Sequence, residues 1–105
     1  MLKGTYPLDR FQGLRTPFYY YDTALLQYTL DAIKEQIKDR PTWQVHYAVK
    51  ANHNPVLLKQ IAAAGFGADC VSGGEVQAAL DAGFAPSSIV YAGVGKADWE
   101  ILLAL

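Results

Sequence analysis

The sequence predicts an α/β fold in which parallel strands alternate with helices. Short apolar segments of strand length recur along the chain, and each is followed by a segment with helical features. The segments AAGFGADCV and DAGFAPSSIVYAG also share one plan, in which a helix end is followed by Gly-Phe, a short loop and an apolar strand. These strands are almost continuously apolar, which is typical of parallel strands that are covered on both faces.

The first third of the chain is expected to hold a lead-in, one strand and one helix. Residues 1–15 are polar and turn-rich, and we interpret them as the lead-in. The aromatic run Phe18–Tyr21 has a strong preference for strands. Asp22 is a suitable N-cap for an amphipathic helix from Thr23 to about Lys38. Its apolar residues recur at three- and four-residue steps, namely Leu26, Leu30, Ile33 and Ile37.

Three strand–helix units are predicted in the rest of the chain. Asn54 followed by Pro55 marks a helix start, because asparagine is a good N-cap and proline is favoured at the first helical position. Gly65 and Gly83 are suitable helix stops. The predicted strands are 44–50, 66–72 and 88–92, and the predicted helices are 56–64, 73–82 and 97–105.

The last segment, Trp99–Leu105, is apolar and has neither a C-cap glycine nor a polar tail. Such a helix must bury its apolar face against another element. Three strand–helix units are also too few for an eight-stranded barrel, which needs about 250 residues. A complete small open sheet is one alternative, but we expect the chain to be a piece of a larger α/β domain.

The composition is that of a globular protein and argues against several classes of partner. The 105 residues are 51% hydrophobic and 18% charged, with nine basic and ten acidic side chains. This balance gives no electrostatic basis for binding nucleic acid or an anionic membrane, so we expect neither partner. The start of the sequence shows no secretory signal, and no apolar run is long enough to span a bilayer. The single cysteine, Cys70, excludes an internal disulfide, so we expect a cytoplasmic protein.

Two further patterns are given no catalytic role. His46 and His53 have no second set of metal ligands at a suitable spacing, so no metal site is expected. The stretch with Gly93, Gly95 and Lys96 lacks both the longer glycine spacing and the Ser or Thr of a phosphate loop. We therefore expect no nucleotide site.

Lys50 is the candidate catalytic residue, because it ends a predicted buried strand. Alternation along QVHYAVK places His46, Ala48 and Lys50 on one face, and the short Ala48 leaves space beneath the lysine. Ligands of parallel α/β folds bind at the carboxyl ends of the strands. Partial loss of hydration there would favour the neutral amine, which attacks aldehydes. The alternative is a strand-end lysine whose amine simply reaches water.

The predicted strand 66–72 runs through the sequence GADCVSGGE. Ser72 and Glu75 have the spacing of a capping box, in which each side chain accepts a hydrogen bond from the other residue's backbone N–H. Asp69 faces opposite to Cys70 inside an apolar strand, where an unpaired carboxylate is costly. We therefore expect Asp69 to be buried and to orient a histidine or hold a cationic partner near the site. Cys70 is expected to be a small core residue.

Several motifs resemble those of one enzyme family. YAVKAN, followed by Pro55, resembles the lysine motif of the fold-type III pyridoxal-phosphate enzymes, which include amino-acid decarboxylases and alanine racemase. The continuation Asn-His-Asn-Pro is similar to the decarboxylases rather than the racemases. The segments TPFYYYD, GADCVSGGE (Gly67–Glu75) and YAGVGKADWE resemble the diaminopimelate decarboxylase branch. The resemblance runs from about Thr16 to the end of the sequence.

The resemblance implies that residues 16–105 are the first part of a (β/α)8 TIM-type barrel domain that binds pyridoxal 5′-phosphate. This barrel would stop after about three strand–helix units, without the carboxyl-terminal β domain. Lys50 would hold the cofactor covalently, and Asp69 and Glu75 would be supporting cofactor-site residues. The implied reaction converts an amino-acid substrate, meso-diaminopimelate, to L-lysine and carbon dioxide in a homodimeric enzyme. The chain alone would be inactive, because it lacks the phosphate-binding segment and the second domain.

Two alternatives stay open on the sequence. Another fold-type III enzyme, such as an ornithine or arginine decarboxylase or a racemase, would use the same kind of lysine motif. A non-enzymatic interaction module would instead pair its exposed strand edge with a partner protein. The residues themselves indicate the α/β repeat and a candidate lysine, whereas the substrate follows only from the resemblance.

Overall fold

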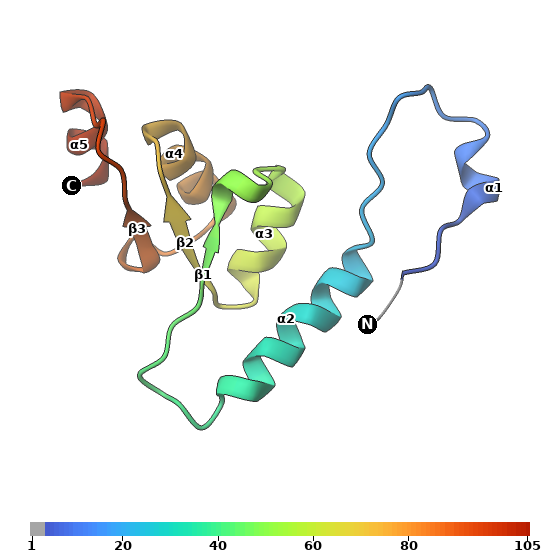
Figure 1. Ribbon diagram of the computed structural model, residues 1–105, viewed down its shortest axis with the longest axis horizontal. Coiled ribbons are helices and arrows are strands. Elements are labelled where there is room, and N and C mark those ends of the chain that lie inside the picture. Colours follow the sequence, from blue (N-terminus) through green and yellow to red (C-terminus); the bar gives the residue numbers. More distant parts are fainter. Residues whose placement is uncertain (1–3) are drawn as a thin grey trace.

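The computed structural model describes residues 4–105 and has the predicted alternation of strands and helices (Figure 1). Three parallel strands are each followed by a helix, so these are three consecutive units of the kind that build a (β/α)8 barrel. Residues 1–3 of the predicted lead-in lie outside the described part. The helices are α1 (Leu8–Phe11), α2 (Thr23–Ile37), α3 (Pro55–Ala63), α4 (Gly73–Ala82) and α5 (Asp98–Ala104), and the strands are β1 (His46–Ala48), β2 (Gly67–Cys70) and β3 (Ile89–Tyr91).

The three strands form one parallel sheet in the order β1-β2-β3. In its register Ala48 pairs with Asp69, and Asp69 pairs with Val90. Because the strands run in the same direction, their carboxyl ends lie at one edge of the sheet. The segments that follow the strands, including the one that carries Lys50, therefore leave the sheet at the same edge.

The hydrophobic core lies between the sheet and the helices α3 and α4. Ala68 and Cys70 of β2 are fully buried, and so is Val49 just after β1. Cys70 is thus the core residue that the sequence predicts. Burial, followed by the charges of Glu75 and Asp69, raises the pKa of the Cys70 thiol to about 11. The core residues of the two helices are Leu58, Ile61, Val76, Ala79 and Ala82.

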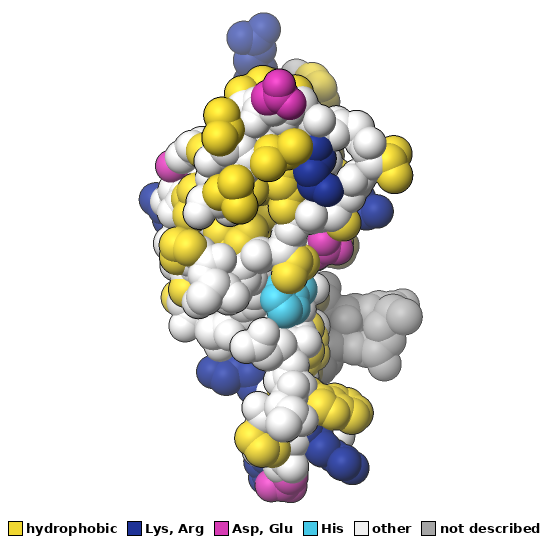
Figure 2. All heavy atoms as spheres, turned by 90° about the vertical axis from the view of Figure 1, so that its left-hand side faces the viewer, with side chains coloured by type: hydrophobic (Ala, Val, Ile, Leu, Met, Phe, Trp, Pro, Cys, Tyr) yellow, Lys and Arg dark blue, Asp and Glu magenta, His cyan; other side chains and the backbone are white. Residues whose placement is uncertain are grey.

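The other face of the sheet is open in this chain, and the edge strands β1 and β3 each pair with β2 alone among the described strands. Val90 of β3 is 46% exposed. Figure 2 shows hydrophobic side chains gathered on the end of the molecule that carries β3 and α5. A closed barrel would cover both this face and these edges with further strands. The exposed apolar residues of this end include Val90, Val94, Trp99, Ile101 and Leu102.

Side-chain caps fix the helix starts where the sequence predicts them. The backbone N–H of Leu25 donates to Asp22 Oδ1 at 2.9 Å, at the start of α2. Asn54 caps α3 in the same way, because its Oδ1 accepts from Val56 N at 3.0 Å. Gly83 ends α4 with φ at 94°, a left-handed conformation that glycine adopts without strain.

The predicted strand at Phe18–Tyr21 is wrong. This segment pairs with no strand within the described chain, and its side chains are exposed. Ring contacts take the place of strand pairing, since the Phe11 ring centroid lies 5.2 Å from those of both Phe18 and Tyr20. Strand preference reflects how well a side chain fits a half-buried sheet surface. Here Phe18 and Tyr20 pack against Phe11 of the short helix α1. This helix was not predicted.

The remaining strands are shorter than predicted, and a 3-10 turn replaces one end of β1 and one end of β3. Val49–Ala51 forms such a turn after β1, and Pro86–Ser88 forms another before β3. Val49 is fully buried although it lies outside the strand. The apolar sequence at Val49 therefore indicated burial, and burial does not require strand pairing.

Helix α2 runs away from the sheet (Figure 1). Hydrogen bonds from a side chain of α3 join the two helices. Gln60 Nε2 donates to the Thr23 carbonyl oxygen at 2.8 Å and to Gln27 Oε1 at 3.1 Å. Leu30 is the buried residue of α2 and joins the core cluster. These contacts fix α2 relative to α3 and the core.

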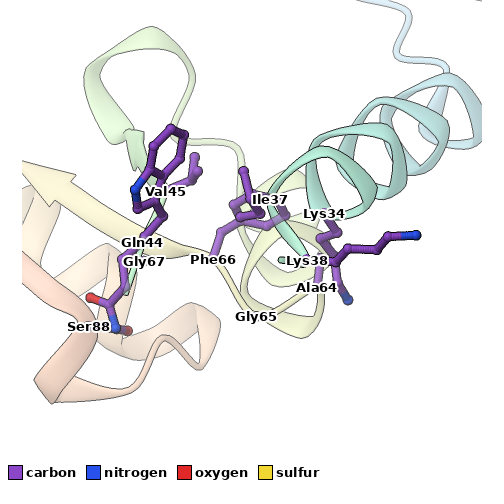
Figure 3. A pocket seen from close by; sticks show the side chains of 11 residues that line it. Lys34, Ile37, Lys38, Gln44, Val45, Ala64, Gly65, Phe66, Gly67 and Ser88 are labelled. Atoms are coloured by element: carbon purple, nitrogen blue, oxygen red, sulfur yellow. The ribbon is translucent and has the colours of Figure 1, made fainter. Parts of the chain in front are cut away.

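A cavity of about 340 Å³ lies at the amino ends of the strands (Figure 3). Val45, Phe66 and Ser88, which precede the three strands, contribute to its lining. Lys34 and Lys38 also line it, and their side chains extend from α2 away from the strands (Figure 3). None of the predicted site residues lines this cavity, which lies at the end of the sheet opposite to Lys50.

We expect Gly67→Ala to destabilise the chain. A Cβ at Gly67 would overlap the His46 ring and lie 2.5 Å from the Ser88 carbonyl oxygen. Because that oxygen belongs to the backbone, the sheet must shift, and overpacking of this kind costs about 1–3 kcal/mol. Urea denaturation of the variant measures the loss.

Gly74→Ala is the matched control for this prediction. Only Ser72 Oγ, 3.8 Å away, lies near a Cβ at Gly74. Alanine also favours the helix over glycine by up to about 1 kcal/mol. This variant should therefore be as stable as the parent chain or slightly more so, and equal losses in both variants would contradict the explanation.

Candidate active site at the carboxyl ends of the strands

Lys50 lies in the middle of the 3-10 turn Val49–Ala51, two residues after the last residue of β1. The prediction that Lys50 is the last residue of the strand is wrong in detail. The lysine does lie at the carboxyl ends of the strands, as predicted. Its side chain is exposed and not desolvated as expected, because Val49 takes the buried position of the turn. Within residues 4–105 the Lys50 amine forms neither a hydrogen bond nor an ion pair; the ion pair found there joins Lys38 and Glu35.

Asn52 holds the end of the Lys50 turn through three hydrogen bonds. Its Oδ1 accepts from Asn54 N at 3.0 Å, and its Nδ2 donates to the Tyr21 hydroxyl at 3.1 Å. The Asn52 carbonyl oxygen accepts from the Tyr47 hydroxyl at 3.0 Å. Burial raises the pKa of Tyr47, while this bond to the Asn52 backbone partly lowers it.

Sequence reasoning assigned no role to Asn52. The one local signal is its spacing from Asn54, because an asparagine side chain often bonds the backbone N–H two residues further on. The bond to Tyr21 joins residues 31 positions apart, and nothing in the sequence indicates such a contact.

Asp69 of β2 is half-buried, which contradicts the expectation of a buried carboxylate. It does face opposite to Cys70, as predicted, since Cys70 is fully buried in the core. Its neighbours in the register are Ala48 and Val90, both uncharged, and the described residues give it no ion-pair partner. The open face of the sheet lets water hydrate this carboxylate, so it needs no partner in this chain.

Ser72 and Glu75 form only half of the predicted capping box. Glu75 N donates to Ser72 Oγ at 3.2 Å, as expected. The Glu75 carboxylate, however, accepts from Val71 N at 2.8 Å and not from Ser72 N. The backbone of Ser72 is extended, with φ at −149° and ψ at 160°, so that the amide just beyond β2 is the one bonded by Glu75. Glu75 therefore fixes the exit of β2 at the same edge as Lys50.

Glu100 joins the second and third strand–helix junctions. Its Oε1 accepts from Gly73 N, the first residue of α4, and its Oε2 accepts from Ala97 N, both at 2.8 Å. These hydrogen bonds, that of Ala97 first, lower the pKa of Glu100. Burial, followed by the nearby Glu100 carboxylate, raises the pKa of Tyr91. Sequence reasoning missed Glu100, although its place three residues after Ala97 is that of a capping glutamate.

Lys96 lies at the third strand–helix junction, near Tyr91 and Glu100. Lys96 Nζ donates to the Gly93 carbonyl oxygen at 2.8 Å and lies 4.9 Å from the centroid of the Tyr91 ring. Both contacts are local to this junction. His53 is exposed, and no group of three or more potential metal ligands occurs in the part of the chain that the structure describes.

One residue of this site, Lys50, fits one group of pyridoxal phosphate, its aldehyde. A primary amine without a partner stands at the carboxyl edge of a parallel sheet, which is the chemistry that an aldehyde cofactor requires. Ala48 is the last residue of β1 before the Lys50 turn, and Gly73 and Gly74 follow β2, so small residues border the carboxyl ends of the strands.

In the described residues no helix is long and apolar enough to cross a membrane.

The chain belongs to a family of cofactor-dependent enzymes. The family described as pyridoxal-dependent decarboxylase, pyridoxal binding domain, matches residues 25–105. This match includes Lys50, Asp69 and Glu75. It confirms the family resemblance, the cofactor class and the enzyme class that the sequence motifs indicate.

Within this family the chain is similar to diaminopimelate decarboxylases. It is 59% identical over 104 residues to the enzyme of Bacteroides thetaiotaomicron, covering 99% of this chain and 27% of that protein. It is 47% identical over 97 residues to that of Helicobacter pylori. A crystal structure of the Helicobacter pylori enzyme complexed with L-lysine has a TM-score of 0.84 and 44% identity, over 92% of this chain and 24% of that one. The chain thus spans about a quarter of the length of these relatives.

We expect Glu100→Gln to lower stability at neutral pH, because an amide offers one acceptor oxygen to the two backbone N–H groups. The pKa of Glu100 is below its ordinary value of 4.5, so its stabilising effect is present above that value. The effect is lost as the pH falls through the folded-state pKa. Urea midpoints of the parent and variant should therefore differ at neutral pH and converge below about pH 4.5.

Glu35→Gln is the control for this measurement. Glu35 pairs only with Lys38 on the exposed surface of α2, where an ion pair adds little stability. Its urea midpoint should stay close to that of the parent chain. A pH-independent loss in Glu100→Gln would show that the carboxylate charge has no part in holding the two junctions.

Proposed function

We propose that this chain provides the cofactor-lysine segment of a diaminopimelate decarboxylase, which converts meso-diaminopimelate to L-lysine and carbon dioxide. The observation that carries the proposal is the free amine of Lys50 at the carboxyl edge of the sheet, within a pyridoxal binding domain. Because the chain spans about a quarter of its relatives, the complete reaction is assigned to a protein of their length.

Residues of this chain would bind and orient the reactants. Bound pyridoxal phosphate supplies an electron sink, which takes up the electron pair left when the α-carboxylate departs as carbon dioxide. Lys50 Nζ would hold the cofactor at the carboxyl ends of the strands, and its amine could hold a proton there. Glu75 keeps the exit of β2 in place through Val71 N–H. Asp69, on the same sheet edge, supplies negative charge beside the site.

The proposed substrate rests on how similar this chain is to decarboxylases that act on different amino acids. The diaminopimelate decarboxylase of Helicobacter pylori matches 92% of this chain with a TM-score of 0.84. The arginine decarboxylase of Paramecium bursaria Chlorella virus matches 74% of it, with a TM-score of 0.63 and 29% identity. The TM-score alone does not separate the two substrates, because a diaminopimelate decarboxylase from m. jannaschii also matches with a TM-score of 0.64. The identity of 59% to a diaminopimelate decarboxylase supports diaminopimelate as the substrate. The relative's complex with L-lysine, the product of the proposed reaction, is consistent with this choice.

The wider features of the enzyme are part of the same proposal. Residues 1–15 form a lead-in, and residues 16–105 contribute the first strand–helix units of the barrel domain. The active enzyme is a homodimer in the cytoplasm that acts on a small amino acid. The open face and edge beside β3 support the barrel, since they leave apolar surface for further strands.

The first test is to mix the chain with pyridoxal phosphate, reduce it with borohydride and map the modified peptide. We expect labelling at Lys50 to exceed labelling at Lys59, an exposed lysine of α3 that serves as the internal control. Lys50→Ala should abolish the dominant labelled peptide and leave labelling at Lys59 unchanged. Equal labelling of the lysines would contradict a specific role for Lys50 in this chain.

A further inference from the structure

We propose that Tyr21, Asn52 and Tyr47 form a positioning network for Lys50. The inference rests on the proposed function, because it concerns how this chain presents the lysine that would hold the cofactor. The Lys50 side chain makes none of the hydrogen bonds of this network. One member, Tyr21, comes from the segment that precedes α2. Its members position Lys50 through the backbone of the turn.

Asn52 is the centre of the network and lies two residues after Lys50. Its side-chain oxygen, side-chain nitrogen and carbonyl oxygen each have a partner, at 3.0, 3.1 and 3.0 Å. The Tyr47 hydroxyl comes from β1, before the lysine, and bonds the chain after it. The turn that carries Lys50 is therefore closed from both sides, which restricts rotation of its backbone.

Tyr21 provides the one bond of the network that reaches beyond the local turn. Its hydroxyl accepts from Asn52 Nδ2, while its side chain is 40% exposed and its ring stacks on Tyr19. A hydrogen bond at such an exposed position adds little to folding, because water replaces it when it is lost. Its effect is instead to reduce the number of conformations of the Lys50 turn, which is how supporting residues preorganise a reactive group.

Tyr21→Phe tests the network, because it removes one hydroxyl and keeps the ring. Tyr19→Phe is the matched control, since Tyr19 is 88% exposed and stacks on the same ring without bonding Asn52. Amide hydrogen exchange at Asn54 N–H, which donates to Asn52 Oδ1, reports on the turn directly. We expect exchange there to speed up in Tyr21→Phe by about 2- to 10-fold, the range that one neutral hydrogen bond provides, and to stay unchanged in Tyr19→Phe.

Reductive labelling with pyridoxal phosphate gives the second measurement. The ratio of labelling at Lys50 to that at Lys59 should fall by a similar factor in Tyr21→Phe. Combining Tyr21→Phe with Asn52→Ala should add nothing to the effect of Asn52→Ala alone, because both changes break the same bond. Tyr47→Phe is a second single variant, for use if Tyr21→Phe does not fold, and it should give the same two changes.

The possible outcomes separate this inference from the proposed function. If Tyr21→Phe and Tyr19→Phe exchange alike at Asn54, the network is overturned. If exchange speeds up but the Lys50 labelling ratio does not change, the bonds are structural and the positioning role is overturned. If the parent chain shows no preference for Lys50, the proposed function fails in this chain and the positioning role fails with it.

Discussion

Parallel pairing of β1, β2 and β3 is the interaction on which the rest of this structure depends. The register Ala48–Asp69–Val90 aligns the strands so that all three end at one edge of the sheet. That alignment places the turn with Lys50 beside the start of α4. It also leaves backbone N–H groups at each strand exit without a partner in the sheet, and these groups need acceptors.

Side chains supply those acceptors, and they connect one junction to the next. Glu75 bonds Val71 N–H at the exit of β2, and Glu100 bonds the N–H groups of both Gly73 and Ala97. Acidic residues suit this place, because amides at the start of a helix carry partial positive charge. At the carboxyl ends of the strands, Glu75 and Glu100 thus accept hydrogen bonds from the backbone. The Lys50 amine has no partner in the described chain.

The fold was largely predictable from the sequence because its signals are local. Asp22 and Asn54 cap their helices as their residue types suggest, and Gly83 ends α4 in the left-handed conformation. The strand predicted at Phe18–Tyr21 failed because an aromatic run indicates that rings will be packed but does not specify their partner. The apolar pattern also overran the strand ends, since Val49 is buried without being paired.

The candidate site was predictable only in part. The position of Lys50 at the carboxyl ends of the strands was predictable, because it follows an apolar segment. Its exposure was not, because this depends on whether the open face of the sheet is covered. Asp69 shows the same dependence, because the open face hydrates a carboxylate that was expected to be buried. Asn52 and Glu100 were missed because their roles come from long-range contacts, with Tyr21 and Gly73, that no local pattern encodes.

The strand order has a consequence for how such a chain can fold during synthesis. Because each strand pairs with the strand before it in the sequence, a newly made strand–helix unit finds its partner already formed. Contacts between neighbouring units close shorter loops than contacts between distant units would. Each parallel pair still needs a helical crossover, however, as between His46 and Gly67, so a sheet of this kind forms more slowly than a bundle of helices. The segment that carries Lys50 belongs to the first of these units, so its turn can form before the later strands have left the ribosome.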